Sequence, residues 1–151
     1  MSTLPAPGTA RPALTHLSSR DALVLVACGG ALGTFARWLL AAVLGSTDGL
    51  SAGVVMANVI GAGGLGYLQS RLQASTLDQV RGERLTLFLG VGVLGGFTTY
   101  STLAVHGAVL LDGGAWWTAL WHVVAQVAIG LGAAVLGLVA GSGRDFRGGR
   151  R

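Results

Sequence analysis

The chain has 151 residues, of which 52% are hydrophobic and only 11% are charged, and its mean hydropathy is +0.65. This composition excludes an ordinary soluble domain and indicates a membrane protein. The formal net charge is +4, and most arginines stand beside apolar segments, a placement that more often sets topology and contacts anionic lipid than binds nucleic acid. We therefore expect membrane lipid, and not nucleic acid, as a partner.

Four apolar segments are long enough to cross a bilayer as helices, which takes about 20 residues each. Lipid offers no partners for loose backbone groups, and no segment shows the alternation of a barrel strand, so an all-α membrane protein is expected. The first segment is too long for the apolar core of a signal peptide, and we expect the chain to retain it. The sequence predicts a disordered tail at 1–20, a transmembrane domain at 21–141 and a basic tail at 142–151. The four spans are roughly Ala22–Gly45, Ser51–Leu72, Leu85–Leu111 and Ala115–Gly141.

The arginines are distributed unevenly between the two sides of these spans. Nine of the ten flank the termini or the connection between the second and third spans, whereas only Arg37 lies toward the opposite side. The positive-inside rule therefore predicts a multi-pass protein of the cell membrane with both termini in the cytoplasm. Arg37, near the non-cytoplasmic end of the first span, has two interpretations. It is either a structural anchor that bonds helix carbonyls or a vestibule residue that attracts anions.

Glycines recur at helical contact spacing in the first two spans, at Gly29–Gly33 and Gly61–Gly66. The second cluster matches the dinucleotide-binding pattern G-x-G-x-x-G, but it lies inside an apolar span rather than after a strand. Close packing of membrane helices is the better interpretation of both clusters. Asn58 begins the small face of the second span. Its amide is expected to point into a helix interface, where ligand binding and interhelical packing remain equally open.

No Asp, Glu or Lys lies within the four spans. A small proton-coupled exporter needs a carboxylate in the membrane, so this class is disfavoured. An enzyme is not expected either, because Ser101 has no evident activating base and neither His106 nor His122 has an acidic partner. His122 is interpreted mainly as a hydrogen-bonding packing residue. The polar groups inside the spans are mostly donors, which suit an anion, and they include Arg37, Asn58, Gln126 and the hydroxyls of Thr34, Thr98, Thr99, Ser101 and Thr102.

The third span contains the stretch GGFTTYSTL, from Gly95 to Leu103. Paired glycines followed by β-branched threonines are poor residues for a helix interior. Non-helical backbone at membrane depth is tolerated only where protein or a water-filled cavity satisfies it. We therefore predict that the third helix is broken here. The alternative is a continuous helix whose hydroxyls bond back to carbonyls one turn earlier.

Three motifs together resemble the Fluc (CrcB-like) fluoride channels, which are small four-helix membrane proteins that assemble as antiparallel dimers. Their order and spacing agree with the family over roughly Ala22–Gly141. The resemblance implies passive export of fluoride that relieves fluoride toxicity. The motifs are GGALGTFARW (Gly29–Trp38), NVIGAGGLG (Asn58–Gly66) and GVLGGFTTYSTL (Gly92–Leu103).

The resemblance also implies where ions bind. By motif position, the backbone carbonyls of Gly95 and Thr98 would hold a structural Na⁺, together with the same pair from the partner. Fluoride accepts hydrogen bonds and donates none, so a dry pore must replace its water with donors. The implied fluoride pathway consists of Asn58, Tyr100, Ser101, Thr102, His122 and Gln126.

The chain departs from the family pattern at four positions. Tyr100 and Leu103 stand where phenylalanine is usual, while His122 and Gln126 replace a tyrosine and a serine. Leu103 offers no positive ring edge to an anion. Two functions therefore stay open: a conducting subunit, or a non-conducting subunit that completes a heterodimeric channel, with a small ion-coupled exporter less favoured. The one-sided arginines predict a single orientation, so the partner is either a second copy or, preferably, a related chain inserted the opposite way.

Overall fold

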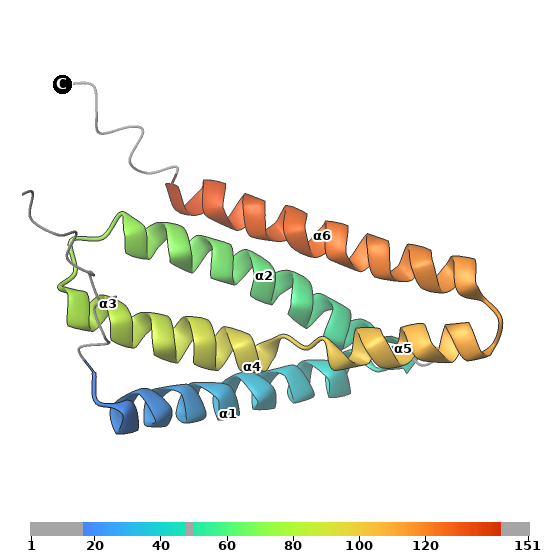
Figure 1. The fold of residues 1–151 in the computed structure, drawn as a ribbon, viewed down its shortest axis with the longest axis horizontal. Coiled ribbons are helices and arrows are strands. Elements are labelled where there is room, and N and C mark those ends of the chain that lie inside the picture. Colours follow the sequence, from blue (N-terminus) through green and yellow to red (C-terminus); the bar gives the residue numbers. More distant parts are fainter. Residues whose placement is uncertain (1–16, 48–49, 143–151) are drawn as a thin grey trace, which may run out of the picture.

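The computed structural model describes residues 17–47 and 50–142, so the predicted tail residues 1–16 and 143–151 lie outside the described part (Figure 1). Its helices are α1, α2, α3, α4, α5 and α6, with a more widely wound π-helical segment, η1, between α3 and α4. A short antiparallel pair of strands, β1 and β2, joins α1 to α2, with Ser46 opposite Ser51. The bounds are α1 Ser19–Leu44, β1 Ser46–Thr47, β2 Leu50–Ser51, α2 Ala52–Gln73, α3 Gln79–Leu85, η1 Thr86–Leu94, α4 Gly95–Phe97, α5 Ser101–Asp112 and α6 Trp116–Ser142.

The described residues contain four helical stretches that are long and apolar enough to cross a membrane, which confirms the predicted spans. The third stretch, Gln79–Asp112, combines α3, η1, α4 and α5. It begins at Gln79 rather than at the predicted Leu85, because the Asp78 side chain caps it by accepting a 2.8 Å hydrogen bond from the Arg81 N–H. Capping of this kind extends a helix into polar sequence that hydropathy alone does not detect. Helix α1 likewise begins at Ser19, slightly before the predicted Ala22.

Close approaches at glycine hold the helices together. A Cβ atom at Gly66 of α2 would collide with the Ala134 carbonyl of α6, and one at Gly137 would collide with the Gly63 carbonyl. In the same way, a Cβ at Gly33 of α1 would meet the backbone of η1 at Val93. The glycine clusters therefore lie in helix contacts, as the packing interpretation predicts, and small residues let the backbones approach.

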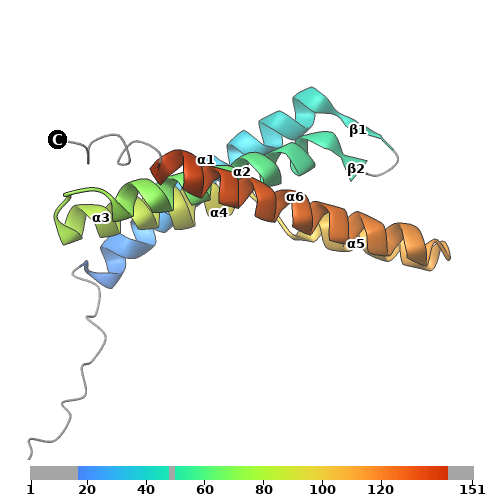
Figure 2. The ribbon, with the colours of Figure 1, turned by 90° about the horizontal axis from the view of Figure 1, so that it is seen from above.

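The two halves of the third stretch pack on different partners. Before the break, η1 and α4 lie against α1, whereas α5 packs on α6. Figure 2 shows α5 and the adjoining part of α6 diverging from α1 and the β1–β2 hairpin. The break therefore lies where the four-helix arrangement opens, and the predicted site residues gather around it.

Candidate functional site

The third span is interrupted at Thr98–Tyr100, between the end of α4 and the start of α5. Thr98 adopts an extended conformation, with φ −88° and ψ 157°. The interruption is visible in Figure 1 as the thin trace between α4 and α5. It confirms the predicted break, and the continuous helix is excluded. The π-helical turns of η1 lie before it, separated from it only by α4, and such turns are often found at functional sites.

The break changes which backbone groups are paired. The Leu94 carbonyl accepts two hydrogen bonds of 3.0 Å, from the Thr98 N–H and from the Thr98 hydroxyl. The next N–H, that of Thr99, would bond the Gly95 carbonyl in a continuous helix. It instead donates to Asn58 Oδ1 at 2.8 Å. The Gly95 carbonyl is thereby released from the helix ladder.

Asn58 of α2 pairs with the interrupted backbone through both ends of its amide. Its Nδ2 donates to the Thr99 carbonyl at 2.9 Å, while its Oδ1 accepts from the Thr99 N–H at 2.8 Å. The side chain is half-buried. Such a reciprocal pair satisfies backbone groups that lipid cannot satisfy. Asn58 is thus an interhelical contact, and its second Nδ2 hydrogen is not used by this pair and remains for a ligand.

Thr99 also prepares the start of α5. Its hydroxyl oxygen accepts from the Ser101 N–H at 3.2 Å and lies 2.8 Å from the Ser101 hydroxyl. The first N–H groups of a helix have no partners within it, and they form the positive end of the helix dipole. Helix α5 therefore begins in the middle of the third span, at the side of the break where an anion is favoured.

Arg37 lies beside the other side of the break. Its Nε donates to the Gly96 carbonyl at 3.3 Å, and the hydroxyl of Thr34, one turn away on α1, donates to the same oxygen at 3.4 Å. These contacts are of the kind that the anchor interpretation of Arg37 expects. Two donors from α1 stabilise a carbonyl at the end of α4, where the helix provides no further partners.

The anchor interpretation makes a prediction about Arg37. Arg37→Ala should lower the stability of the folded chain by about 1.5–3 kcal/mol, the usual value of a hydrogen bond from a charged group, measured by thermal unfolding in detergent. Arg37→Lys keeps the charge and a donor, and should retain most of the flux. If Arg37→Lys instead folds and assembles normally but loses most of its flux, the vestibule role is correct.

A groove of about 540 Å³ runs along the break and brings several predicted residues together. Its walls come from α2, η1, α4, α5 and α6. Tyr100 stands at its edge with 75% of its surface exposed, whereas Leu103 is buried at 8%. Ser101, Thr102 and His122 do not line this groove. The predicted residues that do line it are Asn58, Gly95, Thr98, Tyr100 and Gln126.

His122 and Gln126 lie one turn apart on α6, as their spacing predicts. Gln126 Nε2 is 3.0 Å from His122 Nε2. The sequence interpretation missed a third member, His106 of α5, whose ring centroid lies 4.6 Å from that of His122. The sequence does contain a signal for this contact. His106 and His122 are equally distant from Gly114 in the turn between α5 and α6, and two helices that fold back at a turn bring such positions opposite each other.

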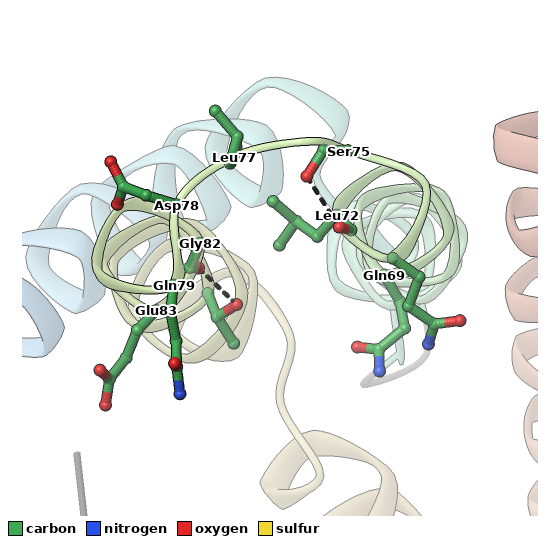
Figure 3. A pocket seen from close by; sticks show the side chains of 10 residues that line it. Gln69, Leu72, Ser75, Leu77, Asp78, Gln79, Gly82 and Glu83 are labelled. Atoms are coloured by element: carbon green, nitrogen blue, oxygen red, sulfur yellow. Dashed lines mark hydrogen bonds between the residues drawn. The ribbon is translucent and has the colours of Figure 1, made fainter. Parts of the chain in front are cut away.

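A second hollow, of about 460 Å³, lies at the connection between α2 and α3, away from the break (Figure 3). Both of its hydroxyl groups bond carbonyls of the preceding helical turn: the Ser75 hydroxyl donates to the Leu72 carbonyl at 2.8 Å, and the Thr86 hydroxyl donates to the Gly82 carbonyl at 2.9 Å. Asp78 both caps α3 and pairs with Arg81. We assign this hollow to the folding of the connection and place the functional site at the break.

Comparison with known families identifies this arrangement. A family model described as "CrcB-like protein, Camphor Resistance (CrcB)" matches residues 24–138. The chain belongs to the CrcB-like family. The predicted resemblance is therefore confirmed, and the match includes all four spans, the break and Asn58.

Several CrcB-like relatives have descriptive names. The chain is 40% identical over 127 residues to "Fluoride-specific ion channel FluC 2" of Leifsonia xyli subsp. xyli, covering 84% of this chain and 87% of the relative. It is 48% identical over 119 residues to "Fluoride-specific ion channel FluC 1" of Rhodococcus jostii, covering 79% and 84%. The FluC of Paracoccus denitrificans is 38% identical over 119 residues, covering 78% and 92%. All three are named as channels rather than enzymes, as predicted.

Proposed function

We propose that this chain is a subunit of a channel that lets fluoride leave the cell passively and so relieves fluoride toxicity. One observation carries the proposal: the broken third span and Asn58 meet in one groove, in a chain whose relatives are named fluoride-specific ion channels. The test is fluoride efflux from liposomes that contain the purified protein. Efflux that is selective for fluoride over chloride supports the proposal.

The chemistry of the groove suits a small anion that only accepts hydrogen bonds. Asn58 has one amide hydrogen beyond its bond to Thr99, and Gln126 and Tyr100 add an amide and a phenol. The start of α5 contributes the positive end of a helix dipole. The lining includes no carboxylate, so neither a repelling negative charge nor a carboxyl group that could exchange protons stands beside the proposed route. This favours a channel over an ion-coupled exporter.

We propose that a structural Na⁺ binds at the break and is not transported. The available oxygen ligands fit such an ion, because the Gly95 carbonyl is released from the helix ladder when the Thr99 N–H bonds Asn58. The extended conformation of Thr98 similarly takes its carbonyl out of the helix ladder. Hard cations prefer oxygen ligands of this kind, and unwound carbonyls commonly provide them in membrane proteins. A bound Na⁺ would stabilise carbonyls that otherwise repel one another.

The proposed assembly is an antiparallel dimer. The groove is open on one side of the subunit, and Tyr100 at its edge is largely exposed. A second subunit that covers this side would enclose the fluoride route and provide a second pair of carbonyls for Na⁺. The partner is a second copy or a related chain. Relatives with numbered names, FluC 1 and FluC 2, fit the second choice.

The alternative function is a non-conducting subunit that completes a partner's channel. Leu103 is the observation that favours it, since this residue lines the groove but has no aromatic edge to offer an anion. A related partner could supply that edge. In such a heterodimer, one pore conducts and the pore lined by Leu103 does not.

The one-sided arginines predict how this chain inserts. We expect both termini to lie in the cytoplasm in nearly every molecule, because basic residues near the spans oppose translocation. The measurement uses single-cysteine variants near each terminus, in a Cys28→Ser background, labelled with a membrane-impermeant reagent in whole cells. Comparable labelling from both sides, together with strong fluoride efflux from the chain alone, would overturn the requirement for a related partner.

A further inference from the structure

Two histidines and a glutamine form a cluster between α5 and α6, and the proposed fluoride route does not explain why His106 belongs to it. The ring centroids of His106 and His122 are 4.6 Å apart, and Gln126 Nε2 lies 3.0 Å from His122 Nε2. All three side chains are half-buried. Within residues 17–47 and 50–142, no group hydrogen-bonds either ring nitrogen of His106. A half-buried imidazole with both nitrogens free is available to bind a ligand.

We propose that His106, His122 and Gln126 form a binding site for a divalent transition metal ion of the zinc class. Imidazole nitrogen is a preferred ligand of Zn²⁺, Ni²⁺ and Cu²⁺. His122 and Gln126 are four residues apart on α6, so both side chains lie on one helix face and reach the same point. His106 approaches from α5 as the second nitrogen ligand. The amide of Gln126 would present its oxygen to the metal, which requires only that its O and N exchange places.

The charges of the helices around the His106–His122–Gln126 cluster allow a cation to bind there. Neither α5 nor α6 contains an arginine or lysine, so these two helices add no positive charge that would oppose the metal. The cluster adjoins the groove, because Gln126 belongs to both and Leu103 lies one turn from His106. Water from the groove can complete the coordination, since two nitrogens and one oxygen leave a fourth position open. On the predicted topology, the metal enters from the non-cytoplasmic side.

A metal at this position would act on the proposed channel. A doubly charged ion one turn from the groove attracts fluoride strongly, and it also holds Gln126, which the pathway needs. Bound metal should therefore inhibit efflux. The expected inhibition of efflux rests on the proposed fluoride function, whereas metal binding itself does not.

Direct binding is the first test. The protein is purified without a tag, in its native assembly, and carries His16→Ala so that His106 and His122 are its remaining histidines. Zn²⁺ binding to this parent is measured by calorimetric titration. We expect about one Zn²⁺ per chain. His106→Phe and His122→Phe keep an aromatic ring but remove its nitrogens, and each should weaken binding at least ~10-fold. Thr118→Ala, at an exposed position on α6, is the matched control and should bind normally.

The second test measures fluoride efflux from liposomes with external Zn²⁺ or Mg²⁺. Zn²⁺ should inhibit the parent and lose potency in His106→Phe, while Mg²⁺, which prefers oxygen ligands, should have no effect. The metal site is overturned if the parent binds no Zn²⁺, or if both phenylalanine variants bind Zn²⁺ as tightly as the parent does. If the chain binds Zn²⁺ through both histidines but transports no fluoride, the metal site stands and the proposed channel function is refuted. The two failures are therefore distinguishable.

Discussion

Asn58→Asp should depress fluoride efflux by at least ~100-fold, which corresponds to about 2.7 kcal/mol. The aspartate keeps an oxygen that accepts from the Thr99 N–H, but it loses the donor that bonds the Thr99 carbonyl. It also places a negative charge beside the route of an anion, and like charges in a poorly solvated groove repel strongly. The measurement is the initial rate of efflux from liposomes with a fluoride electrode.

Two further variants separate the roles of Asn58. Asn58→Ala removes both bonds to Thr99 and leaves half-buried backbone groups unpaired, so we expect lower stability as well as lower flux. Ile60→Ala, at a 52% exposed position on the same helix, is the control and should change neither. Undiminished efflux from a correctly assembled Asn58→Asp protein would remove Asn58 from the fluoride pathway.

Removal of Na⁺ should reduce efflux by at least ~10-fold, or about 1.4 kcal/mol. In the proposed dimer, removal of the proposed Na⁺ would leave the carbonyls of Gly95 and Thr98 from two subunits facing one another unpaired. The experiment replaces Na⁺ by N-methylglucamine on both sides of the liposome membrane. Return of Na⁺ should restore the rate, which separates ion loss from denaturation.

A density map provides a structural check on the same ion. A high-resolution map of the proposed dimer should show a peak between the two Gly95–Thr98 segments. The Na⁺ site is wrong if that position is empty in saturating Na⁺ while efflux is also insensitive to its removal. Transport of Na⁺ alongside fluoride would equally contradict a purely structural ion.

The features that could be predicted from sequence are those that local chemistry determines. Hydropathy located the four spans, since lipid requires long apolar helices. The order of residues in GGFTTYSTL located the break, because paired glycines and β-branched threonines weaken a helix in any context. The start of α3 at Gln79 was missed, since the cap provided by Asp78 lies in polar sequence outside the apolar run.

Contacts between distant residues could not be predicted in the same way. The bonds between Asn58 and Thr99 join residues 41 positions apart, and they depend on the register of α2 against the break. An interface position for Asn58 follows from the sequence, but its partner does not. The contact of His106 with His122 likewise depends on how closely α5 and α6 fold back on each other. Register of this kind is determined by tertiary packing rather than by residue type.

Anion efflux from liposomes tests the central claim most directly. The chain is purified together with any subunit that accompanies it from its native membrane, and the liposomes are loaded with equal fluoride and chloride. After a potassium ionophore allows charge balance, we predict rapid release of fluoride and little release of chloride. Equal release of both anions, or no fluoride release from a correctly assembled protein, would contradict the account.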